Sequence, residues 1–87
     1  MKNLERALKA LANKRRLEIL KALKKALGGE LSVGEIAERI NLSFKATSRH
    51  LKLLTDADIL EKEQRSTQVF YRIGFKDKLI KHIVSIL

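Results

Sequence analysis

The residues best suited to chemistry are cations and a hydroxyl in the stretch NLSFKATSRHLKLL, residues 41–54. An α-helix turns about 100° per residue, so side chains three and four positions apart share one face. By this spacing, one narrow face holds Lys45, Ser48, Arg49 and Lys52, with a single anion, Asp56, at its far end. Ammonium, guanidinium and hydroxyl groups donate hydrogen bonds to anions. This face therefore either binds an anionic partner or is an ordinary solvated surface.

The opposite face of this stretch is mostly apolar and would anchor the helix. Leu51 and Leu54 lie on that side, together with Phe44 and Thr47. The N-terminal half of the cationic face coincides with the positive pole of the helix dipole. This arrangement is typical of a helix whose first turns enter a DNA major groove, so double-stranded DNA is the expected partner.

Net charge supports an anionic partner but does not choose among partners. The chain of 87 residues has 19 Lys and Arg against 10 Asp and Glu, a formal charge of +9. A basic surface binds nucleic acid or anionic lipid. Residues 1–31 hold nine basic and three acidic residues, whereas residues 32–58 hold four of each. We expect the basic side chains of residues 1–31 to form a mostly solvated face.

Several kinds of site lack the residues that they need. The chain has no cysteine, which excludes disulfides and thiolate metal sites. Ser48 and His50 are two positions apart, so on a helix they face different ways and cannot form a nucleophile–base pair. No apolar run approaches the roughly 18 residues of a membrane span. We expect a cytoplasmic protein that is not an enzyme, needs no cofactor and does not engage a membrane.

The first third of the chain reads as two helices. Helical spacing begins near Leu4, and Asn13 is a good N-cap for a second helix. The apolar stripe of this second helix would be Leu17, Leu20, Leu23 and Leu27. Gly28 and Gly29 should end it, because glycine tolerates the left-handed conformation that terminates helices.

Two short helices with a tight turn between them follow. Ser32 and Glu35 match the S-x-x-E capping box, which opens a helix of about two turns. Residues 41–43 then separate it from the helix that carries the cations, which Ser43 can cap. The cationic helix should run from Phe44 to about residue 57. This spacing predicts a helix-turn-helix.

A β-hairpin is expected after residue 58. A tip near residues 65–67 fits, and a two-residue tip would place Glu61 opposite Arg72, a favourable pair. The tip lacks the Asn-Gly type of sequence that tight turns favour, so we predict a looser turn. A last helix from about Lys76 closes the chain. The second strand is marked by the alternation of Val69, Tyr71 and Ile73.

Apolar stripes at both ends of the chain predict a second subunit. A domain of this size buries only about 60% of its unfolded surface, so its stability is marginal without a disulfide, a metal or a partner. The stripes can close the core of one chain or pair with another chain. For a homodimer, the expected contacts are Leu4, Leu8, Leu11, Leu79, Ile80, Ile83, Val84 and Leu87.

The segments LKALANKRRLEILKAL and LSVGEIAERINLSFKATSRHLKLLTDADILEKEQRSTQVFYRI resemble the ArsR/SmtB-type winged helix-turn-helix repressors. The similarity spans about Leu8 to Ile73, and its most specific part is SRHLKLL followed by a strand and VFYRI. It implies a homodimer built from the first and last helices. It also implies a recognition helix from Phe44 in the major groove and a hairpin that touches DNA as a wing.

Helix geometry indicates the cationic face as the contact surface, whereas the resemblance implies Thr47 and His50 on the helix and the contacts of the wing. Phe44 stands where the family often has glutamine, and phenylalanine can contact a thymine methyl or anchor the helix to the core. His50 can be a DNA contact or a hydrogen-bonded, partly buried residue. The positions expected to bind DNA are Ser43, Lys45, Thr47, Ser48, Arg49, His50 and Lys52 on the helix, and Arg65 and Thr67 on the wing.

The metal sites of the family do not match this chain. Where metal-responsive members carry cysteines, this chain has Ser32 and Gly34. Asp77 and His82 on the last helix are five positions apart, which does not place one above the other as three or four would. The sequence therefore predicts no metal site.

We expect one domain over residues 1–87, mainly α with a small β-hairpin: a winged helix-turn-helix of about five helices and a two-stranded wing. The expected function is that of a dimeric, sequence-specific repressor that binds a pseudo-palindromic operator and does not respond to metal. A small-molecule or protein effector is left open. The alternatives are a protein-interaction module of the same fold and a non-specific architectural DNA-binding protein.

Overall fold

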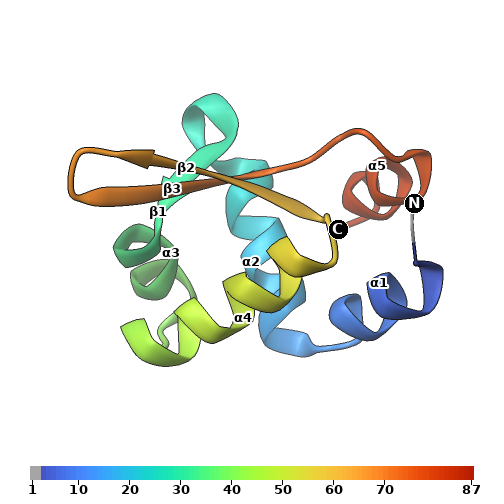
Figure 1. Ribbon diagram of the computed structural model, residues 1–87, viewed down its shortest axis with the longest axis horizontal. Coiled ribbons are helices and arrows are strands. Elements are labelled where there is room, and N and C mark those ends of the chain that lie inside the picture. Colours follow the sequence, from blue (N-terminus) through green and yellow to red (C-terminus); the bar gives the residue numbers. More distant parts are fainter. Residues whose placement is uncertain (1–2) are drawn as a thin grey trace.

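The computed structural model describes residues 3–87, which form five α-helices and a three-stranded antiparallel sheet (Figure 1). The elements are α1 (Leu4–Leu11), α2 (Lys14–Lys25), the 3₁₀ turn η1 (Leu27–Gly29), β1 (Glu30–Ser32), α3 (Val33–Ile40), α4 (Phe44–Asp56), β2 (Leu60–Arg65), β3 (Gln68–Ile73) and α5 (Lys78–Ser85). The predicted winged helix-turn-helix is confirmed, with three strands in place of two.

Side-chain caps start the helices where the sequence predicts them. Asn13 accepts a backbone N–H at 3.1 Å at the start of α2. Ser32 and Glu35 form both hydrogen bonds of the capping box at α3. Ser43 accepts a backbone N–H at 3.1 Å at α4. Each cap satisfies a group that has no partner inside its helix, so local sequence sets where α3 and α4 begin.

The turn between α3 and α4 is as short as the sequence predicts. Asn41 ends α3 with φ 54° and ψ 54°, a left-handed conformation that asparagine adopts more easily than most residues. The Leu42 N–H donates to the Ala37 carbonyl at 3.0 Å, and the Leu42 side chain packs against the core. This closed turn fixes the direction in which α4 leaves α3.

The sheet contains a strand that the sequence did not reveal. Its order is β1-β3-β2, and β1 pairs with β3 through Glu30↔Arg72 and Ser32↔Phe70. The hairpin of β2 and β3 reaches past the helices as a wing, at the left of Figure 1. β1 joins the base of this wing to the start of α3, so the wing and the helix-turn-helix share one support.

The hairpin register matches the sequence, but its turn does not. Glu61 faces Arg72 as expected, and the pair Arg65↔Gln68 leaves only Ser66 and residue 67 in the turn. Ser66 has φ 56°, a positive value of the kind that two-residue hairpin turns need. The predicted looser turn is therefore wrong, because a serine takes the left-handed conformation without asparagine or glycine.

The end of α2 also differs from the prediction. The helix stops at Lys25, and Leu27 is 98% exposed, so Leu27 does not belong to the apolar stripe. Gly28 and Gly29 have φ 74° and 72° and reverse the chain within η1, after the helix has already ended. Glycine is suited to both positions because it has no Cβ.

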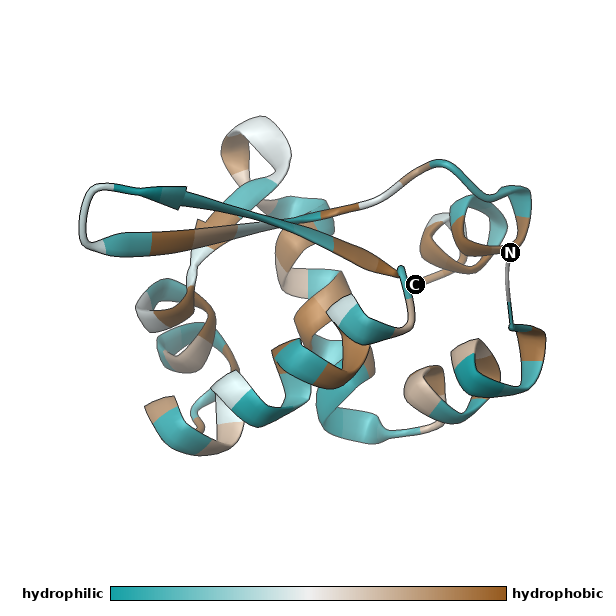
Figure 2. Cartoon of the chain, in the orientation of Figure 1, coloured by the Kyte–Doolittle hydropathy of each residue, from teal (hydrophilic) through white to brown (hydrophobic). Residues whose placement is uncertain are grey.

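One apolar core lies among the helices and the sheet, and α2 forms its centre. The apolar residues, brown in Figure 2, gather on the sides of the elements that face one another. Ile19, Leu20 and Leu23 of α2 are buried against Leu51 and Leu54 of α4 within the same cluster. This packing supports α4 from behind. Within residues 3–87 no helix is both long and apolar enough to cross a bilayer.

Candidate nucleic-acid interface

α4 exposes its cations and buries its apolar side. Leu51 and Leu54 are buried in the core behind the helix. The predicted contact residues that reach solvent on α4 are Lys45, Arg49 and Lys52, with Ser48 half-buried and Ser43 exposed at the cap. The orientation derived from helical spacing is therefore what the structure shows for the cations.

The positive charge of α4 is freest in its first half. Within residues 3–87, Lys45 and Arg49 form no hydrogen bond or ion pair. Lys52 Nζ lies 2.9 Å from Asp56 Oδ2, and this hydrogen bond lowers the pKa of Asp56. Lys52 thus already has an anionic partner. The unpaired cations lie nearer the N-terminal end, where the helix dipole is also positive.

The prediction that Thr47 contacts DNA is wrong. Its side chain is 0% exposed, and among the described residues its hydroxyl has no hydrogen-bond partner. A residue two positions after Lys45 lies about 200° around the helix, on the side that packs into the core. The family position pointed to DNA, but the helical geometry of this chain turns Thr47 away from it.

His50 is a half-buried residue that contacts another helix. Its Nδ1 lies 3.4 Å from Nη1 of Arg16, so the arginine can donate to a neutral ring. Burial lowers the pKa of His50, and the charges of Arg16, Arg49 and Arg15 lower it further. This favours the hydrogen-bonded, partly buried alternative, in which His50 positions α4 against α2.

Arg15 and Arg16 brace the helices around α4. Arg16 Nε donates to the Ala10 carbonyl at 2.6 Å near the end of α1, in addition to its contact with His50. Arg15 Nη1 donates to the Ile40 carbonyl at 2.7 Å at the end of α3. These two arginines are therefore the part of the basic surface of residues 1–31 that also satisfies carbonyl groups at helix ends.

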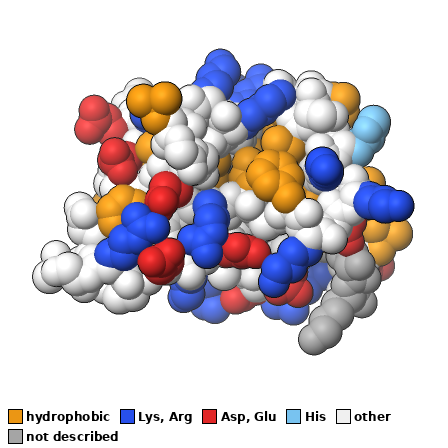
Figure 3. Space-filling view, turned by 90° about the horizontal axis from the view of Figure 1, so that it is seen from above, with side chains coloured by type: hydrophobic (Ala, Val, Ile, Leu, Met, Phe, Trp, Pro, Cys, Tyr) orange, Lys and Arg blue, Asp and Glu red, His pale blue; other side chains and the backbone are white. Residues whose placement is uncertain are grey.

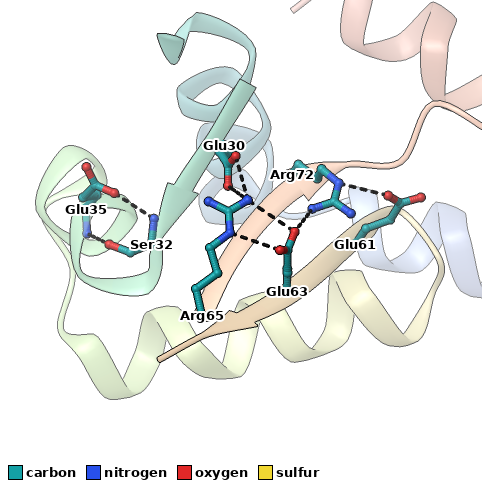
Figure 4. Close-up of polar contacts among 7 residues, drawn as sticks. All are labelled: Glu30, Ser32, Glu35, Glu61, Glu63, Arg65 and Arg72. Atoms are coloured by element: carbon teal, nitrogen blue, oxygen red, sulfur yellow. Dashed lines mark hydrogen bonds and ion pairs between the residues drawn. The ribbon is translucent and has the colours of Figure 1, made fainter. Parts of the chain in front are cut away.

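Arg65 of the wing is held by carboxylates on the outer face of the sheet (Figure 4). Its guanidinium lies 2.9 Å from Glu30 Oε2 and 3.1 Å from Glu63 Oε2, and it stacks over the Phe70 ring at 4.8 Å. Hydrogen bonds to Glu63 and Glu30 hold the pKa of Arg65 above its usual range. Arg65 is therefore not a free cation at the wing tip.

The same network extends along the sheet. Arg72 lies 3.2 Å from both Glu61 and Glu63, and Lys76 lies 3.7 Å from Glu61. Figure 3, seen from above, shows basic and acidic side chains intermixed on this face. We call the six residues Glu30, Glu61, Glu63, Arg65, Arg72 and Lys76 the sheet ladder. Its three acids and three bases leave this face close to neutral.

The other face of the wing carries a cation that the sequence analysis missed. Successive side chains of a strand point to opposite faces, so Lys62 and Gln64 lie on the side of β2 away from Glu63 and Arg65. Lys62 is exposed, and its charge contributes to the lowered pKa of Asp56 at the end of α4. The alternation of β2 could have identified Lys62. Thr67, at the tip, is exposed as expected.

The structure has the parts of a winged helix-turn-helix: a capped helix pair, a cationic second helix and a wing. A comparison of the sequence with known families gives the same assignment. Residues 13–62, more than half of the chain, match the family described as "Bacterial regulatory protein, arsR family". The chain belongs to the ArsR family. It is therefore a transcriptional regulator with a DNA-binding winged helix-turn-helix, and not an enzyme.

The proteins that this chain resembles include both an activator and a repressor of transcription. The transcriptional activator HlyU of Vibrio cholerae is 39% identical, over 92% of this chain and 69% of that protein. The transcriptional repressor SdpR of Bacillus subtilis is 32% identical, over 76% of this chain and 70% of that protein. A homodimeric winged helix-turn-helix DNA-binding domain from Mycobacterium bovis has a TM-score of 0.80 at 30% identity, covering 95% of this chain and 72% of that chain.

The residues predicted for a dimer interface divide into two groups in this ArsR-family chain. Leu4 and Leu8 of α1 are 55% and 48% exposed. Leu79, Ile83 and Leu87, at the other end of the chain, are half-buried. Figure 1 places both α1 and α5 at the end of the molecule opposite the wing tip. These five residues are available to a partner.

The prediction of an interface role is wrong for the other three residues. Leu11, Ile80 and Val84 are buried within the single chain, where they belong to the core cluster. An apolar stripe shows which side of a helix is buried, but not whether its own chain or a partner covers each position. Phe75 and Ile86, which the sequence analysis did not assign, are exposed apolar residues flanking α5.

The residues considered for a metal site have other surroundings. Asp77 Oδ1 accepts the Leu79 N–H at 2.8 Å and caps α5, while His82 is exposed. Within residues 3–87, no three His, Cys, Asp or Glu side chains are grouped so as to hold a metal ion. The chain also has no cysteine, the ligand type expected of thiolate sensors.

Proposed function

We propose that this regulator is a homodimeric repressor that recognises a pseudo-palindromic DNA site through α4 and the wing, without a metal ion. The observation that carries the proposal is the exposure of Lys45 and Arg49, which have no partner within residues 3–87, on a helix anchored from behind. Such cations can bind phosphates and guanine without first giving up an ion pair.

The residues of α4 contact different parts of the DNA, according to their position on the helix. Arg49, in the second turn, reads a guanine edge, since a guanidinium matches O6 and N7. Lys45 binds a phosphate, and Ser48 donates to a base edge or a phosphate. Ser43 lies at the positive end of the helix, where an exposed backbone favours a phosphate. Lys52 contributes less, because Asp56 neutralises part of its charge.

On the wing, Lys62 takes the role that the sequence gave to Arg65. Arg65 would have to leave Glu30 and Glu63 before binding a phosphate, whereas Lys62 is exposed on the opposite face of β2. Thr67 at the tip offers a hydroxyl to the backbone of the DNA. The sheet ladder then serves to hold the wing in shape.

Pairing of two chains would align two α4 helices on one DNA. The exposed residues of α1 and the half-buried residues of α5 offer an apolar surface at one end of the molecule. A two-fold dimer reads half-sites about 34–36 Å apart, which requires a pseudo-palindrome. The Mycobacterium bovis domain, described as homodimeric, supports this assembly.

Repression, rather than activation, is the regulatory effect that requires the fewest contacts with other proteins. A dimer that occupies a promoter blocks transcription by its position alone, and SdpR provides a relative described as a repressor. HlyU, described as an activator, makes activation the second candidate. A reporter gene placed behind the selected DNA site separates the two, because deletion of the regulator raises expression only for a repressor.

Selection of binding sites from a random DNA pool tests the proposal. A repressor of this kind should enrich one pseudo-palindromic sequence, and chelating agents should leave its binding unchanged. Enrichment of no sequence, together with salt-dependent binding to all duplexes, would identify an architectural protein. Little affinity for any duplex would identify a protein-interaction module and overturn the proposal.

A further inference from the structure

Phe44 is an aromatic side chain in an unusual place for a small domain. It is the first residue of α4, and its side chain is 62% exposed. Anchoring to the core, one of the two roles considered from the sequence, is therefore wrong. An exposed ring at the start of α4 needs another explanation. The next residue, Lys45, is a cation that has no hydrogen bond or ion pair within residues 3–87.

A cleft of about 230 Å³ lies beside this ring. It is bounded by the beginning of α3, the beginning of α4 and the tip of the wing. Its apolar lining comes from Val33, Phe44 and Val69. The rest of the lining is Gly34 and the polar residues Ser32, Thr67 and Gln68. The ring of Phe44 thus forms one wall of a partly apolar recess between the start of α4 and the wing tip, the two elements proposed to contact DNA, rather than an isolated exposed residue.

The chemistry of the major groove restricts what such a recess can recognise. Guanine, cytosine and adenine present hydrogen-bonding groups there, which an apolar wall would leave without partners. Thymine presents one acceptor, O4, and beside it a 5-methyl group, which is the apolar feature of the groove. Phenylalanine has no donor or acceptor in its side chain, so contact with the methyl group is the base-specific interaction open to it.

We propose that Phe44 determines base specificity by packing against the 5-methyl group of a thymine, with the Val33–Val69 cleft as the space that receives that base edge. This inference rests on the proposed function, since it names a feature of the DNA that α4 reads. It predicts that one thymine in each half-site is recognised by its methyl group, independently of the guanine read by Arg49.

The test uses the full chain and the site selected from the random pool. Each thymine of the site is replaced in turn by deoxyuridine, which differs only in lacking the 5-methyl group. For the natural chain, one replacement per half-site should weaken binding about fourfold, the equivalent of one buried methyl group of about 0.8 kcal/mol. For Phe44→Ala, the same replacement should change the affinity less than 1.5-fold (about 0.2 kcal/mol).

Leu53→Ala is the matched control, because Leu53 is another exposed apolar residue of α4 at its far end. This variant should keep the fourfold effect, and circular dichroism should show that both variants fold. If the deoxyuridine effect is absent, or is equal in the natural chain and Phe44→Ala, the thymine contact is overturned while the repressor proposal stands. If the pool yields no enriched site, the proposed function itself fails, and this inference with it.

Discussion

At the scale of single residues, the use of a cation depends on its neighbours more than on its charge. Arg49 and Arg65 are both exposed arginines, but Arg49 has no ion pair within the described chain whereas Arg65 has two carboxylates. Exposed ion pairs are individually weak, about 0.2–1 kcal/mol, yet two of them and an aromatic contact hold one rotamer. We therefore propose that the same type of side chain binds DNA at position 49 and stabilises the wing at position 65.

Arg49→Ala should weaken binding to the selected site by about 1–3 kcal/mol, the value of a good bidentate contact with guanine. It should also relax the preference at one base pair of each half-site, as measured by fluorescence anisotropy with single-base variants. Lys81→Ala, which removes an exposed cation from α5, is the control for net charge. An equal loss on every DNA sequence would assign Arg49 to a phosphate instead.

Lys62→Ala and Arg65→Ala form a second pair of variants with opposite expectations. Removing Lys62 should reduce the slope of log Kd against log salt by about 0.9, the value for one phosphate contact. Removing Arg65 should leave the slope unchanged, because its charge is already shared with Glu30 and Glu63. A lower slope for Arg65→Ala together with an unchanged slope for Lys62→Ala would identify Arg65 as the wing residue that contacts DNA.

Predictions that depend on local helix geometry are correct, whereas predictions that depend on family position or on residues distant in sequence are not. Helical spacing alone is enough to place Lys45 and Arg49 on the outside of α4, and the structure agrees. Thr47 was assigned by family position, which does not include the orientation of the side chain. The partner of Arg65 on β1, Glu30, is 35 residues away in sequence and lies on a strand that could not be foreseen.

At the scale of elements, short local signals define the helix-turn-helix, and longer-range pairing defines the sheet. The capping box of Ser32 and Glu35 and the cap of Ser43 were predictable because each depends on residues within one turn. β1 was not predictable, because three residues cannot show alternation and its identity as a strand depends on β3. The end of α2 lies between these cases, since two glycines follow it but do not form its cap.

The capping box gives α3 a stability that depends on pH. The Glu35 carboxylate accepts the Ser32 N–H at 2.9 Å, and this bond, with the Ser32 hydroxyl, lowers the pKa of Glu35 below its usual 4.5. A carboxyl group with a lowered pKa in the folded state stabilises the fold above its unfolded pKa. That contribution disappears as the pH falls through the lower, folded value.

Glu35→Gln keeps an acceptor at this position but removes its titration. We therefore expect the natural chain to lose more free energy of unfolding than Glu35→Gln between about pH 6 and about pH 3 in urea titrations. Glu38→Gln makes the same charge change on an exposed position of α3 outside the capping box. Equal pH dependence in all three proteins would show that the box does not depend on the carboxylate charge.

At the scale of the whole molecule, the two proposed contact surfaces lie apart. The wing tip is at one end of the molecule, and α1 and α5 are at the other, with α2 and the core between them (Figure 1). A partner chain at the second end would leave both α4 helices accessible. The sequence predicted the ends of the chain as the interface, but it could not show that Leu11, Ile80 and Val84 are covered by their own chain.

Leu8→Glu places a charge in the middle of the exposed side of α1. It should convert the proposed dimer to a monomer, because a desolvated carboxylate without a partner opposes an apolar contact. DNA affinity should fall with it, since two linked half-sites bind more tightly than one. Light scattering with size-exclusion chromatography measures the mass of the protein.

Leu27→Glu is the matched control, because Leu27 is 98% exposed and lies on η1. This variant should keep the mass and the DNA affinity of the natural chain. A Leu8→Glu protein that remains dimeric would place the subunit contact elsewhere on the surface.

The sheet ladder has a consequence for how the protein behaves when crowded. β2 is an outer strand, and such strands present unpaired backbone groups on which a strand of another molecule can add. Here one face of this edge strand carries the charged residues Glu61, Glu63 and Arg65. A strand that added to the edge would have to desolvate these groups and disturb their ion pairs. The projecting hairpin therefore carries its own protection against fibril-like stacking, and exchanging these charges for valine would remove that protection.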